Sequence, residues 1–449
     1  MHIRGPAEAL SKLMTQTNNH ILANHNNHLM EKVVERDNLK RALKQVKGNK
    51  GASGVDKMTV EELLPYLKLH WNRIKQELLE GTYKPAPVRR VEIPKQDGGV
   101  RQLGISTVLD RFIQQAIQQV LTPIFEPTFS QFSFGFRPGK SARQAVYKAQ
   151  EYIQRERNIV VDIDLEKFFD RVNHDLLMMK IVKHVGDKRI HKIIRRYLQA
   201  GVMLNGCCVR SDEGTPQGGP ISPLLSNIML NDMDQELIQR GHCFVRYADD
   251  CNIYVASRRA GQRVYTSISK FISERLKLKV NEQKSAVDCP SQRKFLGFSF
   301  TSCLEVKLRI APQTKEKFKD KIRELTNRNW GISMEERLKR LNEYLIGWSG
   351  YFGIAQAKKI FVEFDAWIRR KLRACLLKQW KRCKTKLTNL INLSLPEGSA
   401  CKIAYSRKGY WNLANTPQIN KALSLAYWRR QGLVKLVDRN NDMLAKAST

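Results

Sequence analysis

The apolar positions of this chain follow two spacings, which separate a mixed region from a helical one. Between about residues 37 and 300, segments with helical spacing are interspersed with short segments in which every second residue is apolar. Beyond residue 300 the helical spacing prevails. The pattern predicts an α+β region followed by an α-helical one. Helices are expected at residues 37–46, 59–80, 108–121, 174–185, 334–348 and 358–383, with a further helix ending near residue 237.

A hairpin is expected from Val88 to Ile105, with its turn at Asp97-Gly98-Gly99. It carries Lys95 and Arg101 near its tip. The forked guanidinium of arginine and the compact charge of the lysine ammonium are both suited to binding a triphosphate. The alternative is an ordinary basic hairpin exposed to solvent.

A second hairpin is expected from Phe244 to Val255, and its turn holds the adjacent carboxylates Asp249 and Asp250. Adjacent carboxylates repel each other, more strongly as water is excluded. Mg²⁺ relieves this repulsion because it is a hard ion that prefers carboxylate oxygens. For this stretch alone, an exposed acidic turn is the alternative.

The segment 159–165 predicts a strand whose two-residue period puts Asp162 and Asp164 on one face. If this strand lies beside the Phe244–Val255 hairpin, Asp164 joins Asp249 and Asp250. The three could then hold two Mg²⁺ ions about 3.5–4 Å apart, with Mn²⁺ as a substitute. Such a pair activates an attacking hydroxyl and neutralises a leaving pyrophosphate.

Two glycine-rich stretches are further candidates for contacts with phosphate or bases. Ser133–Ser141 is a basic loop with Arg137 and Lys140, and it leads into a helix, as nucleic-acid backbone contacts often do. Gly214–Asn227 opens another helix, and its glycines allow close approach to a base pair while Gln217 offers amide hydrogen bonds. A purely structural helix start is the alternative for the second stretch.

The charge balance says more about the class of binding partner than any single motif does. The 449 residues include 78 Lys and Arg against 43 Asp and Glu, a formal net charge of +35. Such a chain is suited to a polyanion, with nucleic acid as the first candidate and solubility by excess charge as the alternative. Nine Lys and Arg and no acid lie between Trp367 and Lys386, among them Arg369, Arg370, Arg373 and Lys378. A helix with this composition suits a duplex backbone; a solvated charged helix is the alternative.

Other features of the sequence bear on membrane association, on the redox compartment and on the N-terminal residues. No apolar run approaches the roughly 20 residues that span a bilayer, so no membrane association is expected. The nine cysteines include no Cys-x-x-Cys pair, which argues against a disulfide framework or a zinc ribbon and favours a reducing, intracellular compartment. Residues 1–30, rich in Asn and His, are expected to be a flexible polar leader, with a metal site as the alternative.

Seven motifs in fixed order resemble the reverse transcriptases encoded by bacterial and organellar group II introns, from about residue 35 onward. They are Ile93-Pro94-Lys95 with Val100-Arg101, Phe134-Gly135-Phe136-Arg137-Pro138, Asp164 with Phe168-Phe169-Asp170, Thr215-Pro216-Gln217-Gly218-Gly219, Tyr247-Ala248-Asp249-Asp250, Asn281-Glu282-Gln283-Lys284 and Phe295-Leu296-Gly297-Phe298.

The resemblance implies an α+β right-hand polymerase. Fingers and palm, with an antiparallel palm sheet, would occupy residues 31–305 after the leader at 1–30. An α-helical thumb, the maturase domain X, would follow at 306–386, and a small basic DNA-binding segment at 387–449.

The resemblance also implies roles for single residues. Asp164, Asp249 and Asp250 would be the catalytic and metal-binding triad. Lys95 and Arg101 would contact the incoming triphosphate, and Gln217 would border the nucleotide pocket. Lys284, also a nucleotide-binding candidate, would lie in the segment that assists pyrophosphate departure. Phe169 would lie under the sugar and exclude a 2′-hydroxyl, so that deoxynucleotides are favoured. Gly297 would belong to the hairpin that grips the primer.

The implied activity is RNA-directed DNA synthesis from dNTPs on an RNA template with a DNA or RNA primer. The implied partners also include the intron RNA, whose splicing the protein would assist, and target DNA for retromobility. The implied setting is a ribonucleoprotein at the bacterial nucleoid, or an organelle. The oligomeric state stays open.

This chain departs from the longer family members in one respect. No histidine follows His242 and the last cysteine is Cys401, so no HNH endonuclease site is expected in this tail. Two other functions compete with the polymerase: a non-catalytic RNA-binding splicing factor, and a host-domesticated reverse transcriptase in repair or defence. The intact Asp164, Asp249 and Asp250 favour the enzyme over the splicing factor.

Overall fold

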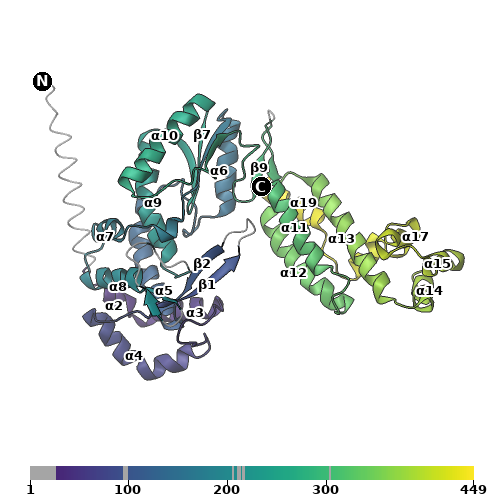
Figure 1. Ribbon diagram of the computed structural model, residues 1–449, viewed down its shortest axis with the longest axis horizontal. Coiled ribbons are helices and arrows are strands. Elements are labelled where there is room, and N and C mark those ends of the chain that lie inside the picture. Colours follow the sequence, from purple (N-terminus) through teal and green to yellow (C-terminus); the bar gives the residue numbers. More distant parts are fainter. Residues whose placement is uncertain are drawn as a thin grey trace. The chain divides into compact units, whose positions relative to one another are not determined.

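The computed structural model describes residues 27–94, 100–204, 207–209, 214, 218–302 and 305–448 (Figure 1). For residues 101–102, 202–204, 207–209 and 447–448 it describes the backbone alone. The described chain forms two compact units, each presented by itself below. Unit 1 comprises the residues up to Tyr152 and Glu156–Asp288, and unit 2 comprises Ile153–Arg155 and the residues from Cys289 onward.

Unit 1 contains two sheets and the helices that cover them. Its elements are α2 (Leu29–Val33), α3 (Arg36–Gly48), α4 (Leu63–Glu80), β1 (Val88–Pro94), β2 (Val100–Ile105), α5 (Val108–Phe125), η1 (Glu126–Thr128), α6 (Ala142–Gln154), β3 (Ile159–Ile163), η2 (Phe168–Asp170), α7 (His174–Val182), α8 (Lys188–Gln199), β4 (Val202–Leu204), β5 (Cys207–Val209), α9 (Ser222–Gln239), β6 (Cys243–Tyr247), β7 (Asp250–Val255), α10 (Arg258–Arg275) and β8 (Ala286–Asp288).

The central sheet of unit 1 has the order β6-β7-β3-β8, and all its neighbours are antiparallel. Helix α10 packs on β3, β7 and β8, and α9 contacts β6 (Figure 1). The apolar residues that face these helices, such as Val161 and Ile253, are fully buried. The predicted antiparallel sheet and the hairpin around Asp249 are therefore confirmed.

The second sheet of unit 1 has the order β2-β1-β4-β5. Strands β1 and β2 are antiparallel with Pro94 opposite Val100, so the predicted hairpin is present, while its tip, residues 95–99, lies outside the described residues. Strands β4 and β5 have three residues each, too few for a periodic pattern to reveal them in the sequence.

A buried carboxylate fixes the segment that leads into β1. Asp110, on α5, accepts hydrogen bonds from the Tyr83 hydroxyl at 2.9 Å, the Thr107 hydroxyl at 2.7 Å and the Ala86 amide at 3.1 Å. Burial raises the pKa of the Asp110 carboxyl, and these donors act against that rise. The connector before β1 is thus tied to the helix that follows β2.

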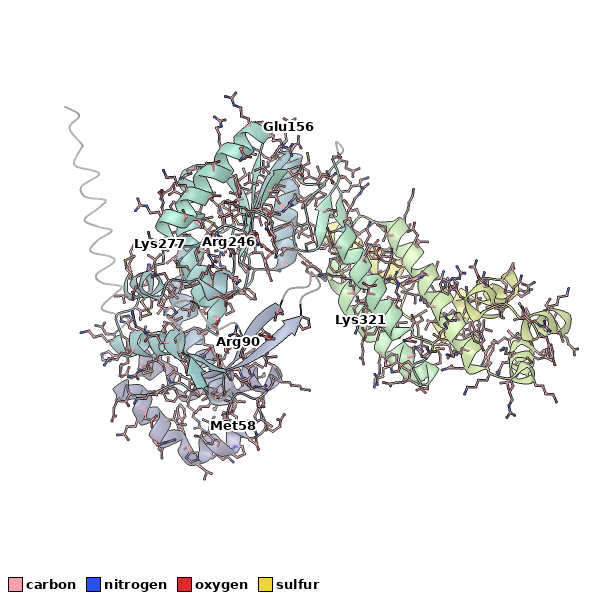
Figure 2. The ribbon with its side chains drawn as sticks, in the orientation of Figure 1. Met58, Arg90, Glu156, Arg246, Lys277 and Lys321 are labelled. Atoms are coloured by element: carbon pink, nitrogen blue, oxygen red, sulfur yellow. The ribbon has the colours of Figure 1, made fainter. Side chains whose placement is uncertain are left out.

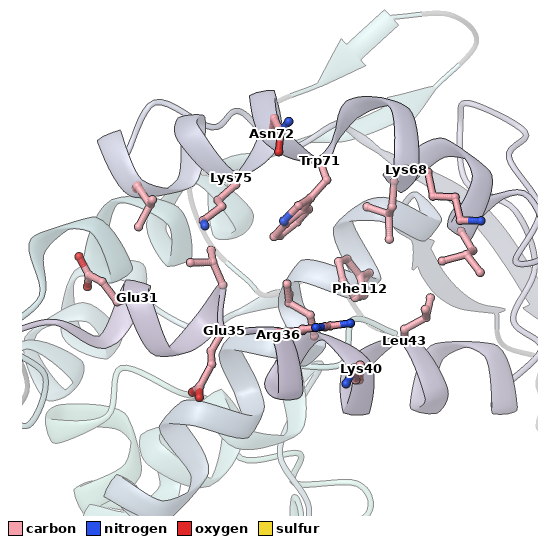
Figure 3. A pocket seen from close by; sticks show the side chains of 15 residues that line it. Glu31, Glu35, Arg36, Lys40, Leu43, Lys68, Trp71, Asn72, Lys75 and Phe112 are labelled. Carbon is pink, nitrogen blue, oxygen red and sulfur yellow. The ribbon is translucent and has the colours of Figure 1, made fainter.

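An apolar pocket of about 770 Å³ lies between α3 and α4 (Figure 3). Trp71 and Phe112 are part of its apolar lining, and Arg36 and Lys75 stand on opposite sides of it. None of the described residues that line it is a predicted site residue. The candidate chemistry of unit 1 is therefore elsewhere.

Unit 2 combines a short hairpin with stacked helices. Its elements are β9 (Phe298–Phe300), β10 (Leu308–Ile310), α11 (Pro312–Leu325), α12 (Met334–Phe352), α13 (Lys358–Gln379), α14 (Cys383–Asn392), α15 (Glu397–Ala404), α16 (Tyr410–Leu413), α17 (Pro417–Ala422), α18 (Leu425–Arg430) and α19 (Leu436–Ser448).

The C-terminal helix α19 packs on α12 and α13. Asp365 of α13 accepts the Leu436 and Val437 amides at 2.9 and 3.1 Å, and the Asn440 side chain donates to the Gly353 carbonyl at 2.7 Å. Unit 2 therefore holds described residues from both segments, 306–386 and 387–449. It begins after Asp288 and contains the paired strands β9 and β10, while the functional domain boundaries at residues 305 and 386 stay predictions.

No helix in the described part of the chain is long and apolar enough to cross a membrane.

Candidate functional site

Strand register brings the three predicted catalytic carboxylates to one edge of the central sheet. Strand β3 ends at Ile163, which lies opposite Cys251 of β7. Asp164 is the next residue on one strand, and Asp250 begins the other. Because β3 and β7 are direct neighbours, the backbone positions of Asp164, Asp249 and Asp250 meet at the same edge. The adjacency on which the two-metal hypothesis depended is therefore present.

A turn at residues 281–285 holds the backbone of Asp164. The Asp164 amide donates to the Ser285 hydroxyl at 3.0 Å, and the Asn281 amide donates to the Asp164 carbonyl at 2.8 Å. The Ser285 amide closes the turn on the Asn281 carbonyl at 2.9 Å. Lys284 is exposed in this turn, and the role of its segment in pyrophosphate departure stays a prediction.

The turn that carries Asp249 and Asp250 is conformationally strained. Ala248 adopts φ +58°, a left-handed conformation that residues other than glycine seldom occupy. The loop at Gly135 packs against it so closely that a Cβ at residue 135 would collide with the Ala248 amide nitrogen. The sequence motif at Phe134–Pro138 therefore supports the acidic turn through its backbone.

Gly214, the first residue of the segment expected to border a nucleotide, lies against the Phe168–Asp170 turn. Phe168 is 3% exposed, while Phe169 is half-buried and packs edge-to-face on it with ring centroids 5.2 Å apart. Gly214 has φ +93°, and a Cβ there would lie 2.8 Å from the Phe169 carbonyl oxygen. Its amide donates to the Val172 carbonyl at 2.9 Å. The glycine at 214 thus permits a backbone approach that no other residue allows.

Three of the predicted nucleotide contacts fall where no side chain is described. Lys95 and Gln217 lie outside the described residues, and of Arg101 only the backbone is described. Their roles remain predictions. Gly218 nevertheless brings the glycine-rich segment near β2, because a Cβ at residue 218 would lie 3.4 Å from the Gly104 carbonyl oxygen.

The residues at the sheet edge fit Mg²⁺ in donor type and in strand register. Three carboxylates offer the hard oxygen ligands that this ion prefers. Within the described ranges, no three His, Cys, Asp or Glu side chains gather closely enough to hold a metal ion. Donor type and strand register are therefore what supports a metal site here.

Two arginines predicted to contact nucleic acid, Arg137 and Arg373, make hydrogen bonds within the fold. The Arg137 side chain is 5% exposed, pairs with Glu126 at 2.7 Å, and donates to the carbonyls of Ser130 and Ser133. Arg373 is 8% exposed and donates to the Leu423 carbonyl at 3.0 Å. Acceptors within the fold therefore engage both guanidinium groups, and the contacts of Arg137 and Arg373 with nucleic acid stay predictions.

The remaining cationic candidates keep more access to solvent. Lys140 is half-buried, with its ammonium 5.2 Å from the centre of the Phe134 ring. The Arg370 guanidinium lies 3.9 Å over the Trp411 ring, Lys378 donates to the Asn329 side chain, and Arg369 is half-buried. Their contacts with nucleic acid stay predictions.

Gly297 forms the tip of a tight hairpin in unit 2. Phe295 and Phe298 exchange two backbone hydrogen bonds of 2.9 Å, and Gly297 between them has φ +85°. A Cβ at residue 297 would lie 2.9 Å from the Phe352 ring. Glycine is required here both by the backbone conformation and by the neighbouring ring.

Sequence reasoning missed three supports of the site: Arg246, Asp234 and Ser285. Arg246 and Asp234 are fully buried, and Figure 2 marks Arg246 in unit 1. An arginine between apolar strand residues was the available signal for a buried ion pair, because such a residue needs an internal partner. Ser285 gave no signal, since its partner Asp164 lies far away in the sequence.

Comparisons with known proteins agree with these observations. Residues 93–300 match the family model "Reverse transcriptase (RNA-dependent DNA polymerase)", and residues 315–390 match "Group II intron, maturase-specific domain". Protein YkfC of Escherichia coli is 32% identical over 299 residues, which cover 58% of this chain and 78% of that protein.

Two other matches cover less of their proteins. The group II intron-encoded protein LtrA of Lactococcus lactis is 35% identical over 226 residues, which cover 49% of this chain and 36% of that protein. A chain of a solved partial Cas6-RT-Cas1–Cas2 complex is 24% identical with a TM-score of 0.36, covering 55% of this chain and 42% of that chain.

Proposed function

This chain belongs to the reverse transcriptases of group II introns, and from this we propose that it copies RNA into DNA at the edge of the sheet where Asp164, Asp249 and Asp250 meet. The observation that carries the proposal is the pairing of β3 with β7, with Ile163 opposite Cys251. This register is what a site made of carboxylates from two distant motifs requires.

In the proposed mechanism the protein's residues bind and orient the reactants. Asp164, Asp249 and Asp250 would hold two Mg²⁺ ions, which would supply activation of the attacking 3′-hydroxyl and charge neutralisation of the leaving pyrophosphate. Phe169, half-buried at the η2 turn, contacts the sugar and selects dNTPs by excluding a 2′-hydroxyl. Lys95 and Arg101 bind the triphosphate, Gln217 borders the base, and Lys284 stabilises pyrophosphate.

Unit 2 is proposed to bind RNA and the primer-template. Support comes from the maturase-specific match at residues 315–390 and from cationic groups such as Arg370 and Lys378. The Gly297 hairpin contacts the primer. Binding of the intron RNA would assist its splicing, and binding of target DNA would serve retromobility, in a ribonucleoprotein of the bacterial cytoplasm or of an organelle.

Primer extension tests the proposal. The wild-type chain and the Asp249→Ala/Asp250→Ala variant are compared on an RNA template with Mg²⁺ and dNTPs, and RNA binding is measured for both. We expect extension by the wild type alone, a loss of more than about 10³-fold in the variant, and equal RNA binding. A folded, RNA-binding wild type that does not extend the primer would contradict the polymerase and favour a non-catalytic splicing factor.

A further inference from the structure

The acidic turn rests on a fully buried arginine in the preceding strand. Arg246 of β6 donates from Nε and Nη2 to the two carboxylate oxygens of Asp234 on α9, at 2.7 and 2.6 Å. Both side chains are 0% exposed. The paired, parallel hydrogen bonds fix the plane of the guanidinium, as a fork on a carboxylate does.

The remaining nitrogen of this guanidinium reaches the turn itself. Arg246 Nη1 donates to the Ala248 carbonyl at 2.8 Å and to the Asn227 side-chain oxygen at 3.0 Å. Asn227 in turn donates to the Gly135 carbonyl at 2.9 Å, which ties in the loop that packs on Ala248. One buried group therefore connects helix α9, the Gly135 loop and the backbone immediately before Asp249.

The charge of the guanidinium is secured by its surroundings. Burial opposes a charged arginine, but the Asp234 carboxylate outweighs this and the pKa of Arg246 is raised. A buried ion pair is a weak source of stability, because the cost of desolvation offsets the attraction. The role of this pair therefore lies in the group that the guanidinium holds. That group is the carbonyl of Ala248, a residue in a strained conformation.

We propose that Arg246 is a positioning residue: by holding the Ala248 carbonyl it keeps the strained turn in the form that presents Asp249 and Asp250 to metal. This proposal rests on the proposed function of the two carboxylates. The strain at Ala248, with φ +58°, favours relaxation to another backbone form. The hydrogen bond from Nη1 opposes that relaxation. Loss of the fork should therefore weaken metal binding without removing any metal ligand.

The test is the variant Arg246→Lys, which keeps the positive charge but lacks the fork. Binding of Mn²⁺ alone is followed by electron paramagnetic resonance, and the Mg²⁺ concentration for half-maximal primer extension is measured in parallel. Both are expected to shift to about tenfold higher metal concentration. Arg189→Lys is the matched control, since Arg189 on α8 also makes a fork on carboxylates in unit 1, but its partners are Glu31 of α2 and Asp187, the residue that caps α8. It should leave both metal measurements unchanged.

A double variant separates positioning from general stabilisation. Glycine adopts positive φ without strain, so Ala248→Gly should restore much of the metal affinity that Arg246→Lys loses. Effects that simply add would overturn the proposal, as would unchanged Mn²⁺ binding in Arg246→Lys. If Arg246→Lys does not fold, Asn227→Ala takes its place, because it leaves the pair with Asp234 intact. A smaller shift, again relieved by Ala248→Gly, is then expected, and no shift would overturn the proposal.

The two proposals fail in distinguishable ways. If the wild type binds Mn²⁺ at the turn and Arg246→Lys binds it more weakly, while neither extends a primer, the polymerase proposal fails and the positioning role stands. If the wild type extends primers and Arg246→Lys keeps its metal dependence, the positioning role fails alone.

Discussion

Arg246 in unit 1 and Arg373 in unit 2 are both buried, but the fold treats their charges differently. Arg246 faces the Asp234 carboxylate, and its pKa is raised. Arg373 donates to the Leu423 carbonyl and to the Asn420 side chain, both neutral, and burial together with the nearby Arg369 lowers its pKa to about 10. The guanidinium that holds the acidic turn is therefore paired with an opposite charge. The one in the helical unit has only neutral hydrogen-bond acceptors among these partners.

Arg246→Met should have the largest effect on stability, because it leaves the Asp234 carboxylate buried without its partner. We expect the free energy of unfolding to fall by about 3–5 kcal/mol, measured by urea unfolding of the full chain with circular dichroism. The control is Asp234→Leu combined with Arg246→Met, which removes both charges and should recover much of the loss. A double variant as unstable as the single one would show that packing, not charge, sets the cost.

Arg373→Met should cost less, about 1–2 kcal/mol, because it strands a carbonyl and an amide oxygen but no buried charge. The same urea experiment measures it. A loss equal to that of Arg246→Met would remove the contrast between the two units.

His184 is a third case with a smaller expected effect, because partial burial disfavours the protonated form of its imidazole. Burial, and secondarily Lys183, lowers its pKa below the usual 6.5. The unfolded chain therefore takes up a proton before the folded chain does, so the stability present above pH 6.5 is lost as pH falls. We expect His184→Gln to reduce the loss of unfolding free energy between about pH 7.5 and 5.5, by less than about 1 kcal/mol. His242, whose pKa is lowered in the same way, remains in the variant and should retain part of the loss. An unchanged acid dependence would contradict the assignment to His184.

The sequence allowed the local elements of unit 1 to be predicted, because each has a pattern of its own. Helix α7 begins at His174, where a helix was predicted, and the side chain of Asn173 caps it by accepting the Leu176 amide at 2.9 Å. The hairpin at Ala248 agrees with prediction, and the strand predicted at residues 159–165 is present but ends at Ile163, before Asp164. Their adjacency did not follow from any pattern, since the pairing of Ile163 with Cys251 joins distant segments.

The functions of single cations were harder to predict than the elements that carry them. Arg137 and Arg373 stood in basic stretches, which suggested contacts with nucleic acid. Their acceptors, Glu126 and Leu423, lie 11 and 50 residues away in the sequence, so no pattern of adjacent residues indicates that these charges are engaged within the fold. The count of charges predicted the kind of partner, but not which side chains face it.

The docking of α19 has a practical consequence for dividing this protein. The maturase-specific match ends at residue 390, which invites a cut there. Such a cut would remove the amides of Leu436 and Val437 from the buried Asp365, and Asn440 from the carbonyls of Gly353 and Ala355. A shortened protein would then expose the flank of α12 and α13 and invite aggregation. Labels and fusion partners are better joined beyond α19 than placed at residue 390.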